Sequence, residues 1–390
     1  MINFADMKHY WTILLAALLL VSCKKDEPEP DRTMKRVVVV YMAAENSLSP
    51  FANYDLEEIR KGMTSIPDSC QVVVYFDNAS SQAPEILTFD SKNGEQVLYQ
   101  YRNDPISTDS ATMQQALTII HQKCPARSYG LVMWSHASGW IPPLPRKAFG
   151  IDNGQNDSSQ TTGNMGTEME ITTLANILQK SRMQWDYIFF DACFMQCVEV
   201  VYALRNAVKW CIGSPAEIPG NGAPYDKIMA DMFLEPDEIW HIAEDYYEYY
   251  PRSTGVVLSV AKTSEMEVLA DATAQLLSAQ SEYPVNDHIQ RYNPNPDITT
   301  WKPEYFDMGS AMGQWYTETE YQTWRQAMEL AFPYRYSPDN WLSYMKGFPT
   351  YPEIIDREHN SAMSMYIPVA GRSMNEYYMQ TEWWKRVKSN

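Results

Sequence analysis

Five short apolar runs separated by helical patterns constrain the fold of this chain more than any other feature. The runs occupy residues 36–41, 71–76, 129–134, 187–190 and 210–213. Helical patterns lie between them, at about 53–63, 110–123, 168–182 and 194–207. The runs lack the alternation of a one-sided sheet, so each is expected to be a strand covered on both faces. Strands that alternate with helices predict an α/β fold, with a mostly parallel sheet between two layers of helices.

The rest of the chain adds a hairpin and a less regular C-terminal part. Residues 85–90 and 96–101 bracket Asn93-Gly94, a turn signal that predicts an antiparallel pair at or outside the edge of the sheet. Beyond residue 251 the pattern changes, and we expect strands at 255–260 and 363–367 and helices at 264–277 and 375–388. The expected division is an α/β domain over residues 35–250 and an α+β extension over residues 251–390, packed on its sheet.

The N-terminus is typical of an exported protein. The apolar run 11–21 is too short to span a bilayer and suits the core of a signal peptide. Leu20-Val21-Ser22-Cys23 follows, and it resembles the lipobox of bacterial lipoproteins, in which the Cys thiol is lipidated. We therefore expect residues 1–22 to be a lipoprotein signal peptide and residues 23–34 an acylated Cys23 with an acidic tether. The alternative is a plain secretory signal.

The predicted lipid anchor implies a membrane location, because acyl chains on Cys23 would bury their methylenes in a bilayer. Lys24 follows the anchor, whereas an Asp at this position typically retains lipoproteins in an inner membrane. We therefore expect the outer membrane of a Gram-negative bacterium. The sequence leaves the leaflet and the oligomeric state open.

Composition narrows the class of partner. The chain has 390 residues, 45% of them apolar, and its 31 Lys and Arg against 49 Asp and Glu give a net charge of −18. Such a field repels phosphate backbones, so nucleic acid is excluded as an expected partner. Six Cys in a chain of this length form no dense disulfide framework, and we expect Cys70, Cys124, Cys197 and Cys211 to be core residues.

Reactive side chains follow two of the predicted strands. The run 129–134 leads into Ser135-His136, and the run 187–190 leads into Asp191-Ala192-Cys193. Ligands of open α/β sheets bind where strands end, so His136 and Cys193 are candidates for a nucleophile with its general acid and base. Cys193 is expected at the start of a helix near Phe194, where the helix dipole would acidify the thiol. The alternative is a core Cys and a hydrogen-bonded His.

The residues around these two positions form longer motifs. They read Trp134-Ser135-His136-x-Ser138-Gly139-Trp140 and Phe190-Asp191-Ala192-Cys193-x-Met195. Together they resemble the clostripain family of cysteine endopeptidases, which share a caspase-like three-layer α/β/α sandwich. Further matches are Ser214, Glu217, Pro219, Gly220, Gly222, Tyr225, residues 306–309 and residues 378–383. The resemblance covers roughly residues 36–388.

The resemblance assigns roles to individual residues. It implies that Cys193 attacks the scissile carbonyl, that His136 protonates the leaving amine, and that no third catalytic residue is required. The N–H groups of Cys193 and Ala137 would bind the oxyanion. Ala137 replaces the usual Gly of the family, and a positive φ there would be costly.

The resemblance also implies a pocket for Arg or Lys before the scissile bond, with Asp191, Glu217 and Asn221 as substrate-binding positions. Asn221 stands where the family has Asp, so one carboxylate of the pocket is missing. Family members often cleave themselves between the two motifs, and Arg146 and Lys147 lie there. The resemblance therefore offers self-cleavage after either of them, against the alternative of a solvated basic turn, and Asn221 weakens the specificity that self-cleavage needs.

No cofactor is required by this chemistry, and no metal ligand is assigned. Calcium remains an open alternative, because clostripain itself binds it and two groups of residues could hold it. They are the turn Asp152-Asn153-Gly154 and the cluster Asp55, Glu57 and Glu58. The competing functions are a non-catalytic surface lipoprotein that binds glycan or protein through its many aromatic residues, and an inactive homologue of the peptidases.

Overall fold

The computed structural model describes residues 33–79, 82–141, 149–154, 166–278, 280–293, 305–344 and 349–388. Residues from Met34 onward cluster as one compact unit. Cys23, Arg146 and Lys147 lie outside the described residues. Within the described part of the chain, no helix is long and apolar enough to cross a membrane.

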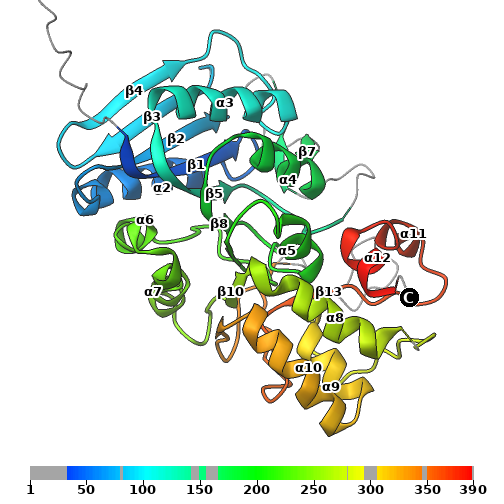
Figure 1. Ribbon diagram of the computed structural model, residues 1–390. Coiled ribbons are helices and arrows are strands. Elements are labelled where there is room, and N and C mark those ends of the chain that lie inside the picture. The colour runs from blue at the N-terminus through cyan, green and yellow to red at the C-terminus, as the bar shows by residue number, and fades with distance from the viewer. Residues whose placement is uncertain are drawn as a thin grey trace, which may run out of the picture. The chain divides into compact units, whose positions relative to one another are not determined.

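A nine-stranded sheet forms the centre of this unit, and its order is β12-β10-β9-β8-β5-β1-β2-β3-β4 (Figure 1). The strands are β1 (Met34–Ala44), β2 (Cys70–Asn78), β3 (Glu85–Asp90), β4 (Gly94–Gln100), β5 (Ala126–Trp134), β8 (Trp185–Asp191), β9 (Trp210–Gly213), β10 (Leu258–Lys262) and β12 (Tyr334–Tyr336). The five strands from β2 to β9 pair in parallel. The other pairs are antiparallel, including the predicted hairpin β3–β4 at one edge. The mostly parallel sheet predicted from the apolar runs is confirmed.

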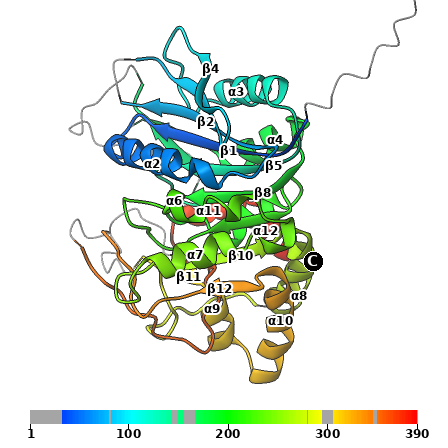
Figure 2. The same ribbon diagram turned by 90° about the vertical axis from the view of Figure 1, so that its left-hand side faces the viewer.

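Helices cover both faces of the sheet, which confirms the three-layer α/β/α sandwich (Figure 2). In β1, Val37 and Val39 pack on one face, and Val38 and Val40 on the other, because side chains alternate along a strand. The first face carries α3 (Ser110–Lys123), α4 (Ile171–Lys180), α5 (Val198–Leu204), α8 (Met266–Leu277), α10 (Glu318–Ala331) and α12 (Glu382–Lys388). The second face carries α2 (Ser49–Gly62), α6 (Tyr225–Ile228) and α7 (His241–Tyr249).

Asp186 on β8 forms two ion pairs at the opposite end of the sheet from the reactive residues, one with Arg36 on β1 and one with Lys209 directly before β9. The Arg36 guanidinium lies 2.7 Å from Asp186, and both side chains are almost fully buried. Lys209 lies 2.7 Å from the other carboxylate oxygen. Burial acts to raise the pKa of Asp186, but hydrogen bonds from Lys209 and Ser128 and the charge of Arg36 lower it below its usual value. Asp186 is therefore an ionised, paired carboxylate at neutral pH.

The C-terminal part of the chain continues the same sheet. The strand predicted at 255–260 is β10, which pairs with β9, and β12 pairs with β10. The strand predicted at 363–367 is the short β13 (Ser364–Met365), which pairs with β11 (Phe306–Asp307) in a separate two-stranded sheet. Another small sheet joins β6 (Phe149–Asp152) to β7 (Thr167–Met169).

The predicted terminal helix 375–388 is wrong as one element. It is split into α11 (Met374–Tyr378), which is capped by Met379, and α12, which Thr381 directly precedes. The Thr381 hydroxyl donates to the Tyr378 carbonyl and accepts from the Trp384 N–H, which makes it the N-cap of α12. The predicted helix 168–182 likewise begins only at Ile171, because residues 167–169 form β7.

Most aromatic residues of the C-terminal half are core residues. Trp324 on α10 and Trp341 are at most 1% exposed, and the Trp324 indole N–H donates to the Thr273 hydroxyl. Tyr321 on α10 is also buried, and Met308–Trp315 forms α9 beside it. Among the described aromatic residues between 305 and 344, Tyr344 alone is a large exposed one. These rings therefore pack the interior and give no support to a glycan-binding surface.

Candidate active site

The pairing of β5 with β8 places the two reactive side chains at the same edge of the sheet. Trp134 and Asp191 are register partners in neighbouring parallel strands. His136 and Cys193 each lie two residues beyond this pair. The two segments that sequence analysis singled out are therefore adjacent where the strands end.

The loops that follow these strands pack against each other. Gly139 has φ +68°, and a Cβ at this position would lie 2.9 Å from the Phe194 carbonyl oxygen. Tyr305 joins the same two loops, because its ring stacks on Phe194 with 4.3 Å between centroids and its hydroxyl donates to the Ser138 carbonyl. Sequence reasoning missed Tyr305, although it directly precedes the matched motif 306–309. The loops that follow His136 and Cys193 in the chain are therefore packed against each other.

His136 is held by its backbone and its ring. Its carbonyl accepts from the Gly150 N–H at 2.9 Å, and its Nε2 lies 2.9 Å from the Ser47 hydroxyl. Burial lowers the pKa of the imidazole to about 4, so the ring is neutral at physiological pH. Sequence reasoning missed Ser47, whose signal is its place just beyond β1, the strand that neighbours β5.

Cys193 does not lie at the start of a helix, so the predicted acidification by a helix dipole is wrong. α5 begins at Val198, and Phe194 has φ +63°. The backbone directly after Cys193 is not helical, because the Phe194 and Gln196 N–H groups donate to the Ala216 and Ser214 carbonyls. Cys197 is therefore the N-cap residue of α5 and not one helical turn beyond Cys193.

The environment of the Cys193 thiol disfavours its ionised form. The residue is half-buried, and its Sγ accepts a 3.5 Å hydrogen bond from the Ile218 N–H. Burial, followed by the negative charges of Glu217 and Asp191, raises the pKa of the thiol to about 12. The described structure therefore combines a neutral thiol with a neutral imidazole.

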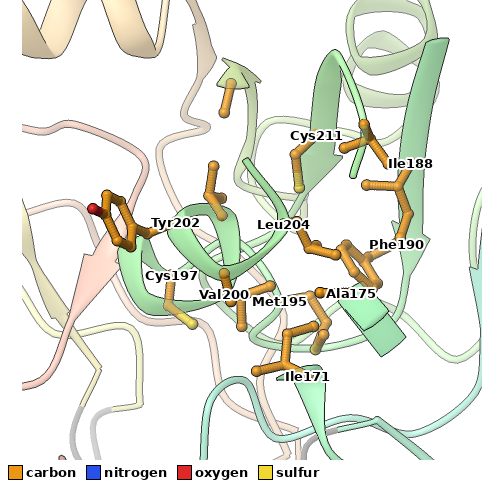
Figure 3. Close-up of a cluster of buried hydrophobic side chains, with 14 of the residues drawn as sticks. Ile171, Ala175, Ile188, Phe190, Met195, Cys197, Val200, Tyr202, Leu204 and Cys211 are labelled. Atoms are coloured by element: carbon orange, nitrogen blue, oxygen red, sulfur yellow. The ribbon is translucent and has the colours of Figure 1, made fainter. Parts of the chain in front are cut away.

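The other cysteines of the described part are buried, as predicted. They are Cys70, Cys124, Cys197 and Cys211. Cys197 and Cys211 lie among the apolar side chains around α5, next to Met195 and Leu204 (Figure 3). This apolar cluster anchors the segment that follows Cys193.

Ala137 does not have a positive φ, so its backbone lies outside the left-handed region. The methyl group that replaces the family's glycine therefore causes no backbone strain. Ala137 forms an isolated antiparallel bridge with Phe149, and the bond of this bridge runs from the Gly150 N–H to the His136 carbonyl. This bond does not use the Ala137 N–H, the predicted oxyanion donor.

An acidic cavity of about 360 Å³ lies beside β8. Its lining includes Asp55 and Glu58 from α2 together with Asn221 and Gly222. A Cβ at Gly222 would lie 2.7 Å from a carboxylate oxygen of Asp191, so Asp191 is directly behind this wall. Sequence reasoning missed the part that α2 plays here, since it treated these two acidic residues as calcium candidates.

Three carboxylates therefore share one partly buried region. Asp191 accepts from the Ala223 N–H and from the Tyr225 hydroxyl, and Asp55 accepts from the Trp134 indole N–H at 2.6 Å. Burial and then the negative charge of Asp191 raise the pKa of Asp55, while burial and the negative charge of Glu58 raise the pKa of Asp191. Burial also raises the pKa of Glu58. A cation entering this region would relieve the repulsion.

Glu217 faces a different part of the chain. Its carboxylate accepts from the Ser343 hydroxyl and from the Tyr344 N–H at 2.7 Å, so it anchors the segment around residue 343. Its charge also acts on the Cys193 thiol. Asn221 is exposed in the turn closed by the Gly222 N–H and the Pro219 carbonyl.

Comparison with known proteins identifies the family of this site. The model of the clostripain family, peptidase C11, matches residues 40–385. The chain belongs to the clostripain family. It is accordingly a cysteine peptidase that acts on peptide substrates. A search of curated proteins gives no match.

Two solved structures of clostripain-family proteins are similar at 30% identity or more. An inactive zymogen C11 protease from Parabacteroides distasonis is 30% identical with a TM-score of 0.78, covering 91% of this chain and 99% of that one. A secreted C11 cysteine protease from Bacteroides thetaiotaomicron, in complex with an irreversible peptide inhibitor, is 32% identical with a TM-score of 0.76, covering 92% and 100%. A third, iotapain from B. thetaiotaomicron, is 19% identical with a TM-score of 0.77 over 91% and 99%, and shares the fold.

Proposed function

We propose that this chain is an exported, lipid-anchored cysteine endopeptidase whose catalytic dyad is Cys193 and His136. The observation that carries the proposal is the Trp134–Asp191 strand pair, which brings both residues to one edge of the sheet. Cys193 Sγ bonds to the peptide carbonyl carbon while its proton passes to His136. The C–N bond then breaks as His136 protonates the leaving amine. Water attacks the resulting thioester, the S–C bond breaks, and the thiol recovers its proton.

The oxyanion of each tetrahedral intermediate would be bound by the N–H groups of Cys193 and Ala137. Such donors contribute about 10²-fold or more in rate. The ordinary backbone of Ala137 supports this assignment, because its methyl group introduces no strain. An unstrained Ala137 also gives no support to the alternative of an inactive homologue.

We propose that the uncut chain is a resting form. A thiol with a pKa of about 12 and an imidazole with a pKa of about 4 form no thiolate–imidazolium pair at neutral pH. The similar protein from Parabacteroides distasonis is described as an inactive zymogen. Activation would follow cleavage after Arg146 or Lys147. We expect this cleavage to change the surroundings of Cys193 and His136. Lower thiol burial in the cut form would lower the pKa of Cys193.

The acidic cavity supports a preference for Lys or Arg before the scissile bond. Asp55 and Glu58 line the cavity beside Asn221, so they supply carboxylates that the Asn221 side chain lacks. Asp191 lies against Gly222 in its wall. A cationic side chain needs desolvated carboxylates as partners, and this region offers three.

A charge-neutral variant of Glu58 tests this specificity with a matched control on the same helix. Glu58→Gln should lower kcat/KM for peptides with Lys or Arg before the scissile bond about 10- to 100-fold, since a charged hydrogen bond is lost. Glu57→Gln should leave kcat/KM unchanged, because Glu57 is exposed and pairs with Arg60. Equal cleavage after neutral residues by the parent enzyme would refute the proposed preference.

The catalytic proposal is tested with the full chain and a peptide library. Cys193→Ala should abolish cleavage and the appearance of two chain fragments, whereas Cys124→Ala should retain both, because Cys124 is a buried core residue. Cleavage that survives in Cys193→Ala would rule out the dyad. An active enzyme that remains one intact chain would rule out activation by self-cleavage.

The proposed anchor rests on the sequence around Cys23. Acylation would attach the protein to a membrane, and we propose the outer membrane of a Gram-negative bacterium. Incorporation of a labelled fatty acid by the parent chain and its loss in Cys23→Ser would support acylation. A parent chain that takes up no label would be a plain secreted protein.

A further inference from the structure

Residues 340–344 and 349–353 form a short antiparallel pair in the C-terminal part of the chain, and we call them the paired segments. Ser343 and Thr350 exchange two backbone hydrogen bonds of 2.9 and 2.8 Å, and they form an antiparallel bridge. Residues directly opposite each other in such a pair project to the same side, and neighbours along one segment project to opposite sides. The register therefore fixes which side chains share a face.

The inner face of the paired segments packs against the part of the chain that carries Cys193. Trp341 and Ser343 are fully buried. Trp341 belongs to an apolar cluster that includes Phe194, and the half-buried Cys193 packs against this cluster. The paired segments are therefore part of the surroundings of the thiol, although they lie far from it in the sequence.

Glu217 fixes the paired segments beside the thiol. One oxygen of its carboxylate accepts from both the Ser343 hydroxyl and the Tyr344 N–H. The next residue, Ile218, donates its N–H to Cys193 Sγ at 3.5 Å. Tyr344 is thus bonded to a residue whose direct neighbour is bonded to the proposed nucleophile.

The outer face of the paired segments carries apolar and aromatic side chains. Leu342 is half-buried and Tyr344 is 49% exposed, and these two alternate with the buried residues of their segment. The register adds the exposed Pro349, opposite Tyr344, and Tyr351, which is opposite Leu342 and 50% exposed. Neighbouring exposed apolar side chains that are fixed on a rigid backbone are typical of an interaction site.

The order of the strands shows which part of a substrate reaches this face. His136 follows β5, Cys193 follows β8 and Glu217 follows β9, and these strands are consecutive in the sheet. β10 is antiparallel to β9, so Gly255, which precedes β10 and forms a bridge with Trp341, lies at the same edge. The paired segments therefore lie on the side of Cys193 away from His136.

The proposed mechanism separates the two halves of the substrate along this edge. The amine leaves with a proton from His136, whereas the acyl part stays on Cys193. Since the leaving half lies on the side of His136, the acyl half extends over β9 toward the paired segments. The residues that reach them are those before the scissile bond.

We propose that the outer face of the paired segments is a substrate subsite and that Tyr344 determines its specificity. The subsite would take a large apolar or aromatic side chain from one of the second to fourth residues before the scissile bond, because aromatic rings bury a large apolar area when they stack. This inference rests on the proposed dyad of Cys193 and His136. A substrate peptide is the expected occupant because the face is continuous with the catalytic centre through Glu217.

Cleavage of a peptide library that varies the four residues before the scissile bond tests the subsite. The parent enzyme should prefer a large apolar side chain over Gly at one of the second to fourth positions by roughly tenfold in kcat/KM. Tyr344→Ala should lose most of this preference, mainly through a higher KM, whereas Tyr344→Phe should keep it because the ring makes the contact. Leu330→Ala is the control, since Leu330 is 55% exposed on α10, outside the paired segments, and its loss should leave the preference unchanged.

Two variants of Glu217 test its part as a positioning residue for Tyr344. Glu217→Gln should keep the preference, because one amide oxygen can still accept from the Ser343 hydroxyl and the Tyr344 N–H. Glu217→Ala removes this acceptor and should lose the preference as Tyr344→Ala does. An equal loss in Glu217→Gln and Glu217→Ala would overturn the positioning role.

The outcomes separate this subsite from the dyad on which it rests. An equal preference in the parent and Tyr344→Ala, with Cys193→Ala inactive, would overturn the subsite and leave the dyad in place. Cleavage that survives in Cys193→Ala would overturn both. A dimer in analytical ultracentrifugation that Tyr344→Ala dissociates would make this face an interface between two copies of the chain, and would also overturn the subsite.

Discussion

The contact between Gly139 and Phe194 allows the packing of the two catalytic loops to be tested by adding one methyl group. Gly139→Ala places a Cβ at a residue with φ +68°, 2.9 Å from the Phe194 carbonyl oxygen. The left-handed backbone alone costs an L-residue about 1–2 kcal/mol. Carbon–oxygen contacts in proteins lie at about 3.3–3.6 Å, so the loops must also separate by roughly 0.4 Å.

Gly94→Ala is the matched control, because Gly94 has φ +71° and no atom lies within 4 Å of its added Cβ. Gly94→Ala should lose about 1–2 kcal/mol in the free energy of unfolding, measured with urea and circular dichroism. Gly139→Ala should lose more than Gly94→Ala, because the contact with the Phe194 carbonyl adds to the cost of the left-handed backbone. Only Gly139→Ala moves the carbonyl that follows Cys193. Since a displacement of about 1 Å can cost 10²-fold in rate, we expect its kcat/KM to fall roughly tenfold, while that of Gly94→Ala stays unchanged.

The result that refutes this reasoning is equality of the two variants. If Gly139→Ala matched Gly94→Ala in both unfolding free energy and kcat/KM, the contact between the loops would be absent in the enzyme in solution. A loss of stability without a loss of kcat/KM would separate the packing of the loops from the placement of Cys193.

Further predictions concern the buried ion pair and the thiol. Asp186→Asn should cost about 3–5 kcal/mol in urea unfolding, because it leaves Arg36 buried and unpaired, whereas Asp339→Asn in an exposed pair should cost at most about 1 kcal/mol. Because the partners lower the Asp186 pKa, its stabilisation is present above the unfolded value near 3.9 and is lost as the pH falls through the folded value. Alkylation of Cys193 by iodoacetamide in the uncut chain should accelerate about tenfold per pH unit from pH 7 to 10, since the thiol pKa is about 12. A fast rate that does not depend on pH would contradict a neutral resting thiol.

The sheet could be predicted from the sequence because its strands are covered on both faces. Val37 to Val40 are fully buried, and such a run leaves no polar face for solvent. His136 and Cys193 could be found for the same reason, because each follows a strand of this kind and parallel strands end at one edge.

The backbone after Cys193 could not be predicted from the local sequence. Helical periodicity favours a start near Phe194, but residues 214–216 accept hydrogen bonds from this segment and delay α5 to Val198. The expected acidification of the Cys193 thiol depended on a helix that starts near Phe194, so this expectation is wrong as well. Tertiary hydrogen bonds decided the geometry, and they come from a part of the chain that local patterns do not include.

The acidic cavity could not be predicted from sequence motifs either. Asn221 alone suggests a weakened pocket for basic residues, because the motif lacks an acidic partner there. The fold brings Asp55 and Glu58 from α2 to the same cavity. Carboxylates from another helix can replace a missing one in a motif, and only the three-dimensional arrangement reveals the replacement.

The order of the sheet determines what cleavage between Ile141 and Phe149 would produce. One fragment would keep β4-β3-β2-β1-β5 and His136, and the other would keep β8-β9-β10-β12 and Cys193. The strand pair β5–β8 would then become the boundary between two polypeptides, with one member of the dyad on each side. The mature enzyme would be a heterodimer made from one gene product, and neither subunit would contain a complete active site.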